Sequence, residues 1–210
     1  MSKHEWRKKE KDTYLPKSKP AFIEVPTFQF ATIRGEGNPN SSEFKEYVGA
    51  LYSLSYTLKM TLKKRDVQPM GYSDYTVYPL EGVWDLQEAA REHYDGTLNK
   101  DDLAYHLMIR QPDFVTPDLF GDMLDLARKK KNPNPKLDQV LFETISEGPC
   151  VQMLHVGPFE NEPESFRQME AFAEAEGLTR LSKTHREIYL SDINKVPAEK
   201  WKTVLRFRVE

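Results

Sequence analysis

A chain of 210 residues suits one large domain or two small modules that share a core. Its net charge of −3 supplies no overall positive field for binding nucleic acid. The sequence also has no apolar run as long as a membrane span and no apolar core of a signal peptide near its start, so neither a membrane nor a nucleic acid is an expected partner.

Composition also limits the chemistry. Cys150 is the only cysteine, which excludes an internal disulfide and a thiolate metal site and favours the cytoplasm. Histidines at four further positions lack the close pairing of a metal site: His93, His106, His155 and His185. No glycine-rich phosphate loop is present, so neither a metal nor a cofactor is expected.

Residues 1–20 are dense in charge. Seven basic residues between Ser2 and Lys19 are interspersed with Glu5, Glu10 and Asp12. A purely basic arm could touch an anion or nucleic acid, but the mixed charges favour a solvated leader with at most one amphipathic turn.

The first half, residues 21–112, predicts four strands and a long helix. The strands are expected at residues 22–25, 28–37, 75–78 and 103–110. Asn40 followed by Glu43 resembles a capping box, and apolar residues at helical spacing continue to about Lys64. The strand at 28–37 is expected to end in a glycine turn that includes Gly35, and a turn at 79–82 should follow the third strand.

A connector is predicted at residues 113–138. Thr116-Pro117-Asp118 combines a cap, a proline in the first turn and a carboxylate at the positive end of the helix dipole. The helix that begins here should end at Asn132-Pro133.

The second half, residues 139–210, repeats the order of the first. Strands are expected at residues 140–146, 151–156, 185–190 and 202–209. A helix should begin after Asn161, with Glu164 in the capping-box position, and close at Gly177. Residues 21–210 therefore predict an α+β domain: two pseudo-symmetric strand–helix–strand–strand modules with antiparallel sheet around a central ligand pocket.

The strand around Glu187 is the candidate centre of that pocket. Alternation along a strand puts His185, Glu187 and Tyr189 on one face and the intervening residues on the other. A carboxylate among aromatic rings could bind a cation or move a proton. The local pattern alone favours a solvated face on which Glu187 is an ordinary surface residue, because lone glutamates are mostly exposed.

Three segments together resemble the GyrI-like small-molecule-binding family. They are His155-Val156-Gly157-Pro158-Phe159, Glu187-Ile188-Tyr189-Leu190-Ser191-Asp192 and Tyr78-Pro79-Leu80-Glu81-Gly82-Val83-Trp84. The runs 51–59 and 108–114 are similar to its stand-alone bacterial branch. The resemblance covers about residues 20 to 210 and implies two modules around a pocket for aromatic, often cationic, molecules.

The resemblance also implies a role for Glu187, which matches a buried glutamate central to binding in the multidrug-sensing activators of this family. Those sensors carry a winged helix-turn-helix domain before this one, whereas only about 20 charged residues precede it here. A self-contained transcription factor is therefore not expected. Some stand-alone members are implicated in hydrolysing strained cyclopropane rings of DNA-alkylating natural products, which would protect the cell.

For that hydrolysis, Glu187 could take a proton from water, and Tyr189 or Tyr78 could donate to the developing oxyanion. Four further rings could stack on a flat ligand: Trp84, Tyr52, Tyr56 and Tyr105. Two alternatives stay open. The protein could bind or sequester cationic drugs without turnover, or it could modulate a protein such as gyrase. The sequence leaves the oligomeric state undetermined.

Overall fold

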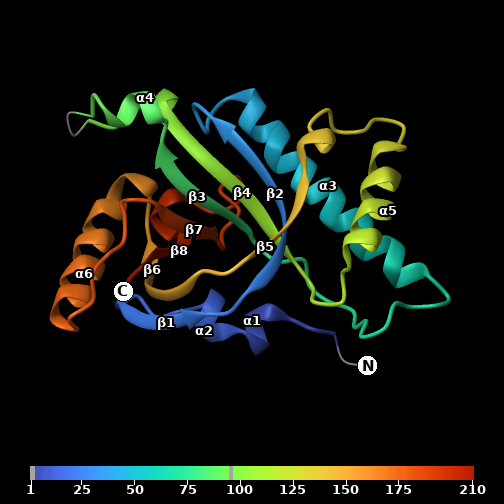
Figure 1. Ribbon diagram of the computed structural model, residues 1–210, viewed down its shortest axis with the longest axis horizontal. Helices are drawn as coiled ribbons and strands as arrows, with labels where there is room; N and C mark the ends of the chain where they lie inside the picture. The colour runs from blue at the N-terminus through green and yellow to red at the C-terminus, as the bar shows by residue number, and fades with distance from the viewer. Residues whose placement is uncertain (1–2, 95–96) are drawn as a thin grey trace. The chain divides into compact units, whose positions relative to one another are not determined.

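A computed structural model describes residues 3–94 and 97–210, which fold into two compact units (Figure 1). Unit 1 comprises Phe28–Tyr78 and Asp85–Ile145 with the described residues before Trp6, and unit 2 comprises Trp6–Thr27, Pro79–Trp84 and Ser146–Glu210. Both combine helices with antiparallel strands, which confirms the predicted α+β class. The segments of the two units are interleaved along the chain, unlike the predicted modules at 21–112 and 139–210. No helix within the described ranges is long and apolar enough to cross a membrane.

Unit 1 is built on three antiparallel strands and two long helices. β2 (Phe28–Glu36) lies between β4 (Leu103–Gln111) and β5 (Leu141–Ile145). Helix α3 (Ser42–Lys64) packs on β2 and β4 and also against α5 (Pro117–Arg128). Short helical segments occupy the connections: α4 (Glu88–Arg91), η1 (Lys100–Asp102) and η2 (Leu137–Gln139).

The two long helices of unit 1 begin where side chains satisfy their first amide groups. Ser41 Oγ accepts a hydrogen bond from Phe44 N at 3.1 Å, so the cap of α3 lies one residue beyond the predicted Asn40. Thr116 Oγ1 caps α5 as predicted and accepts from Leu119 N at 3.2 Å. Both helices then present an apolar stripe to the unit.

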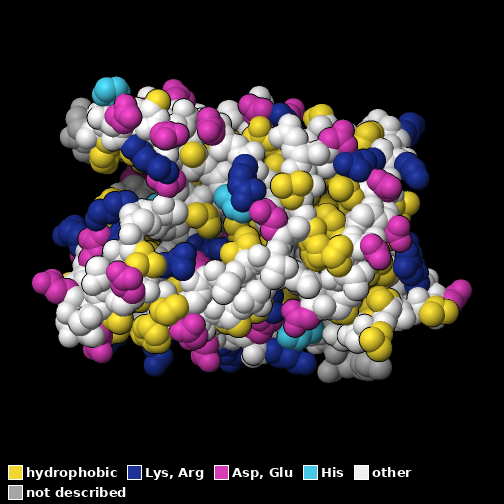
Figure 2. All heavy atoms as spheres, in the orientation of Figure 1, with side chains coloured by type: hydrophobic (Ala, Val, Ile, Leu, Met, Phe, Trp, Pro, Cys, Tyr) yellow, Lys and Arg dark blue, Asp and Glu magenta, His cyan; other side chains and the backbone are white. Residues whose placement is uncertain are grey.

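The edge of unit 1 carries apolar surface. Phe120 of α5 stacks on Phe142 of β5 with ring centroids 4.6 Å apart, and the neighbouring Leu141 is exposed. Figure 2 shows hydrophobic side chains gathered in the region of these two elements. β5 is therefore only partly covered.

The described part of unit 2 forms an antiparallel sheet with the strand order β1-β6-β8-β7-β3. The strands are β1 (Ala21–Val25), β6 (Gly148–Val156), β8 (Lys202–Arg208), β7 (His185–Tyr189) and β3 (Leu80–Leu86), the last up to Trp84. Trp84 lies opposite His185, and Glu187 lies opposite Leu205. Because directly paired residues share a face, these four side chains point to the same side of the sheet.

Helix α6 (Glu162–Ala175) covers that face over β6 and β8 (Figure 1). Its apolar residues form a core with the two strands: Met169 and Ala173 with Val151, Met153, Leu205, Phe207 and Val209. The 3-10 turn η3 (Phe159–Asn161) precedes the helix, and Gly177, with φ of 71°, follows its end. A second 3-10 turn, η4 (Ala198–Lys200), leads into β8.

The other face of the unit 2 sheet holds a buried ionic network. Arg186 Nη1 donates to Glu81 Oε2 at 2.8 Å, and its Nε donates to Glu147 Oε1 at 2.9 Å. Arg206 Nη1 reaches the other Glu147 oxygen at 3.0 Å. Burial alone would raise the pKa of Glu147, but the two guanidinium groups outweigh it and hold that pKa below its usual value.

The N-terminal segment packs on this network. It forms two short helices, α1 (Trp6–Lys9) and α2 (Lys11–Tyr14), in which Trp6 and Tyr14 are 2% and 1% exposed. The carbonyl oxygen of Thr13 accepts from Arg206 Nη2 at 2.8 Å. The charged residues of α1 and α2 are mostly exposed, as expected of a solvated leader, whereas Trp6, in the expected amphipathic turn, and Tyr14 are buried and hold the segment on the sheet. The first two residues of that predicted leader lie outside the described residues.

One predicted strand is displaced along the chain. Residues 75–78 do not form a strand: Tyr75 makes an isolated bridge with His4, and β3 runs instead over the predicted turn. Gly82 of that predicted turn pairs with Glu187 inside the sheet. Pairing with β7 thus overrides the higher strand propensity of the tyrosine-rich run.

Gly35 lies inside β2 and not in a turn. A Cβ atom there would meet Tyr105 Cε2 at 2.5 Å and Tyr47 Cε2 at 2.7 Å, so the strand needs a residue without a side chain. The positive φ of the turn, 93°, belongs to Gly37.

Candidate functional site

Glu187 lies at the centre of β7 and is sheltered from solvent. It is 8% exposed, and His185 Nε2–H donates to its Oε1 at 3.1 Å. The side chain is therefore not the solvated surface residue that the strand pattern also allowed. A buried carboxylate needs such partners, because removing its charge from water is costly.

Tyr189 and Trp84 continue the same face beside Glu187. Trp84 Nε1–H donates to the Tyr189 phenol oxygen at 2.7 Å, and the ring of Phe159 lies edge-on to Tyr189 with centroids 6.1 Å apart. Burial, followed by the charge of Glu187 and a hydrogen bond with it, raises the pKa of Tyr189 well above its ordinary value. Tyr189 therefore stays a neutral phenol that can donate a proton in a hydrogen bond.

A second carboxyl group belongs to this site, which we call the acidic–aromatic site: Trp84, Phe159, Glu162, His185, Glu187 and Tyr189. Glu162 opens α6 and is 7% exposed. The sequence patterns did not identify Glu162. Asn161 occupies the N-cap position of the helix as predicted, although its side chain makes no capping hydrogen bond. The sequence Glu162-Pro163 does indicate the first turn of a helix, but it does not indicate that the Glu162 side chain is buried.

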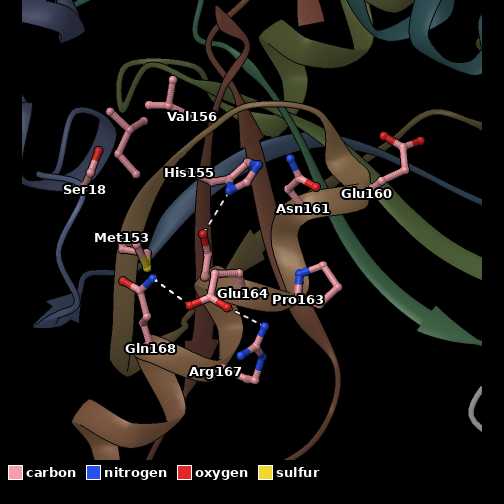
Figure 3. A pocket seen from close by; sticks show the side chains of 12 residues that line it. Ser18, Met153, His155, Val156, Glu160, Asn161, Pro163, Glu164, Arg167 and Gln168 are labelled. Atoms are coloured by element: carbon pink, nitrogen blue, oxygen red, sulfur yellow. Dashed lines mark hydrogen bonds and ion pairs between the residues drawn. The ribbon is translucent and has the colours of Figure 1, made fainter. Parts of the chain in front are cut away.

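An open hollow of about 610 Å³ lies next to the start of α6 (Figure 3). Asn161 and Pro163, which flank Glu162 in the sequence, line it. Figure 3 shows Glu164 held by its helix neighbours Arg167 and Gln168 at one side of the hollow. The lining of the hollow mixes polar and apolar side chains and does not include Trp84, Glu187 or Tyr189, so the hollow lies beside these residues and is not formed by them.

Two of the predicted ligand-binding tyrosines have structural partners in unit 1. Tyr78 is 4% exposed, and its hydroxyl lies 3.4 Å from His4 Nε2 while the guanidinium of Arg110 lies 4.6 Å from its ring centroid. Tyr105 is 3% exposed and donates to the Glu36 carbonyl oxygen at 3.2 Å. Neither ring is presented to solvent.

Tyr52 and Tyr56 stack on each other along α3, with centroids 6.3 Å apart, and Tyr56 is exposed. They belong to unit 1, as do Tyr78 and Tyr105. Among the predicted site residues, the structure brings Trp84, Glu187 and Tyr189 together within a single unit. A role in ligand contact for the four tyrosines of unit 1 stays a prediction.

Metal and thiol chemistry find no support in the described residues. Across residues 3–94 and 97–210, no group of three or more His, Cys, Asp or Glu side chains is arranged to hold a metal ion. Burial raises the pKa of the Cys150 thiol to about 12, so the reactive thiolate is scarce at neutral pH.

These features define an α+β domain that holds a sheltered carboxyl group among aromatic rings. The chain belongs to the GyrI-like family, because the model of the GyrI-like small molecule binding domain matches residues 18–210. No curated protein matches the chain.

Solved structures agree with this family. A hydrolase from Listeria innocua is 38% identical, with 99% of this chain and 100% of that chain covered and a TM-score of 0.88. An uncharacterized conserved protein from the same organism is 39% identical over the same shares, also with a TM-score of 0.88. The C-terminal domain of EcmrR shares the fold, with 16% identity, 91% and 97% coverage and a TM-score of 0.54.

Proposed function

We propose that this protein binds flat aromatic molecules at the acidic–aromatic site and hydrolyses activated cyclopropane rings. The observation that carries the proposal is the sheltered carboxyl of Glu187, with His185 at 3.1 Å and the Tyr189–Trp84 pair on the same sheet face. Membership of the GyrI-like family supports small-molecule binding, and the similar Listeria protein described as a hydrolase supports hydrolysis. Such an activity would remove DNA-alkylating compounds inside a cell.

The chemistry is addition of water to a cyclopropane conjugated with a carbonyl group. Glu187 takes a proton from water as the water oxygen forms a bond to the ring methylene carbon. The ring carbon–carbon bond breaks, and its electron pair moves to the carbonyl oxygen. Tyr189, kept as a phenol, donates a hydrogen bond to that oxygen as its negative charge develops.

Glu187→Gln tests the proposal, with a spirocyclopropyl cyclohexadienone as substrate and mass spectrometry to follow the water adduct. The wild type should make many product molecules per protein, while E187Q should lose turnover and still take up the compound. Glu174→Gln, on the exposed surface of α6, is the matched control and should keep full activity. Full activity in E187Q would remove Glu187 from the mechanism.

Binding of a cation without turnover is a second candidate. A carboxylate at Glu187 beside aromatic rings would attract an organic cation through charge and cation–π contact. The same mass-spectrometric experiment separates the two functions. Intact compound recovered at one molecule per protein supports the binder, whereas repeated turnover supports the enzyme.

A further inference from the structure

Glu162 is an unexplained group at the start of α6. Its side chain is 7% exposed, and among the described residues no hydrogen-bond partner reaches its buried Oε1. A buried carboxyl oxygen without a hydrogen-bond partner lowers the stability of the folded protein. Such a group in a native structure needs an explanation other than stability. The unpaired oxygen is therefore available to something that enters the site.

The packing of α6 on β7 shows where Glu162 points. Phe159, three residues before it, lies against Tyr189 with ring centroids 6.1 Å apart. Phe166, four residues after it, lies against His185 at 4.7 Å. Glu162 lies in the chain between these two contacts, and the charge of Glu187 acts on it, so Glu162 faces the residue between His185 and Tyr189, which is Glu187.

The electrostatics of this pair keep a proton on Glu162. Burial, then the charges of Glu187 and Glu160, raise the pKa of Glu162 to about 10. From β7, the neutral phenol of Tyr189 and the ring of His185 are the other titratable groups on this face. The partial positive charge of the helix N-terminus favours the carboxylate but is a smaller effect than burial beside a second carboxyl group.

We infer that Glu162 is the general acid that completes this site, delivering its proton to the carbonyl oxygen of the substrate while Glu187 removes a proton from water. The inference rests on the proposed hydrolysis and assigns a residue that neither the sequence motifs nor the family match pointed to. Two carboxyl groups whose surroundings separate their protonation states are a common acid and base arrangement.

The step balances without any further reagent. Water supplies an oxygen that bonds to the ring methylene, and its proton passes to Glu187. The broken ring bond supplies the electron pair that makes the carbonyl oxygen negative, and Glu162 protonates that oxygen to give a phenol. Glu162 is then a carboxylate and Glu187 a carboxylic acid, and proton transfer from Glu187 to Glu162 restores the starting state.

Two substrates of different basicity test the role of Glu162. The probes are a spirocyclopropyl cyclohexadienone and its analogue with electron-withdrawing groups beside the carbonyl. The oxyanion that develops on the analogue is less basic, so its reaction depends less on a general acid. Glu162→Gln keeps the shape of the side chain and should lower kcat by roughly 100-fold on the first probe. It should lower kcat clearly less on the second, while Glu174→Gln matches the wild type on both.

The outcomes separate this inference from the proposed hydrolysis. Equal kcat in E162Q and wild type, or an equal loss on both probes, overturns the acid role and leaves the role of Glu187 intact. Absence of turnover in the wild type overturns both. As a second measurement that needs no variant, kcat of the wild type should fall as the pH rises towards 10, and a level profile over that range counts against Glu162.

Discussion

The indole Nε1–H of Trp84 donates a hydrogen bond of 2.7 Å to the phenol oxygen of Tyr189, across 105 residues of sequence. The bond joins the neighbouring strands β3 and β7 on the face that carries Glu187. It lowers the pKa of Tyr189 against the larger effects of burial and of Glu187, which raise it. Trp84 thereby favours negative charge on or near the phenol oxygen and fixes the direction of its hydroxyl hydrogen.

Replacing Trp84 with Phe should therefore slow turnover of a cyclopropyl dienone by about 2- to 10-fold. This factor corresponds to the loss of one hydrogen bond that contributes about 0.5–1.5 kcal/mol. Phe keeps an aromatic ring at this position, so binding should change less than kcat. Steady-state kinetics check this. Trp6→Phe is the control, because Trp6 packs on Tyr14, whose hydroxyl contacts Glu81 of the buried network on the other face of the sheet. An unchanged kcat in W84F would show that the bond does not assist the reaction.

The stability of the protein should depend on pH through Glu162. The native carboxyl keeps its proton up to a pKa of about 10, whereas the unfolded group releases it near 4.5. The unfolded state therefore binds fewer protons between these values, and the free energy of unfolding falls as pH rises, by up to about 1.4 kcal/mol per pH unit.

Glu162→Gln removes that dependence. Urea unfolding between pH 5 and 9 should show E162Q gaining stability relative to the wild type as pH increases. The exposed Glu174→Gln should follow the wild-type curve. Parallel curves for wild type and E162Q would mean that Glu162 does not retain a proton in the folded protein.

Glu147→Gln should destabilise unit 2 strongly. Glu147 accepts from both Arg186 and Arg206, and all three side chains are at most 10% exposed. Removing one partner leaves buried positive charge without compensation, at a cost of about 3–5 kcal/mol by urea unfolding at pH 7. The exposed pair of Glu164 with Arg167 provides the contrast, and Glu164→Gln should change stability by less than about 1 kcal/mol.

The same network predicts the acid response. Because the folded pKa of Glu147 is held below its usual 4.5, its contribution is present above pH 4.5 and is lost as pH falls through the folded value. The difference in stability between wild type and E147Q should therefore shrink in acid. A difference that stays constant down to the acid transition would contradict the role of the two arginines.

Gly35→Ala should cost about 1–3 kcal/mol, because the new methyl group would overlap the rings of Tyr105 and Tyr47. Gly121→Ala on α5 is the matched control: a Cβ there meets nothing within 4 Å, so alanine should stabilise the helix by about 0.5–1 kcal/mol. Thermal unfolding of the two variants should shift in opposite directions. A neutral G35A would show that the two tyrosines can move aside.

Local pattern was sufficient for most of the secondary structure. Apolar residues at helical spacing predicted α3 to Lys64, and Thr116-Pro117 predicted the start of α5, because caps and periodicity act within a few residues. The run at 75–78 failed, since a strand exists only where a partner strand supplies its hydrogen bonds. That partner, β7, lies about a hundred residues further along the chain.

The sequence alone determined that Glu187 shares a strand face with His185 and Tyr189, because side chains alternate along any strand. Only the tertiary structure decided that this face is sheltered, that Trp84 reaches Tyr189, and that Glu162 of α6 faces Glu187. Burial and charge coupling arise between residues distant in the chain, and no local pattern of residue types encodes which of them will meet.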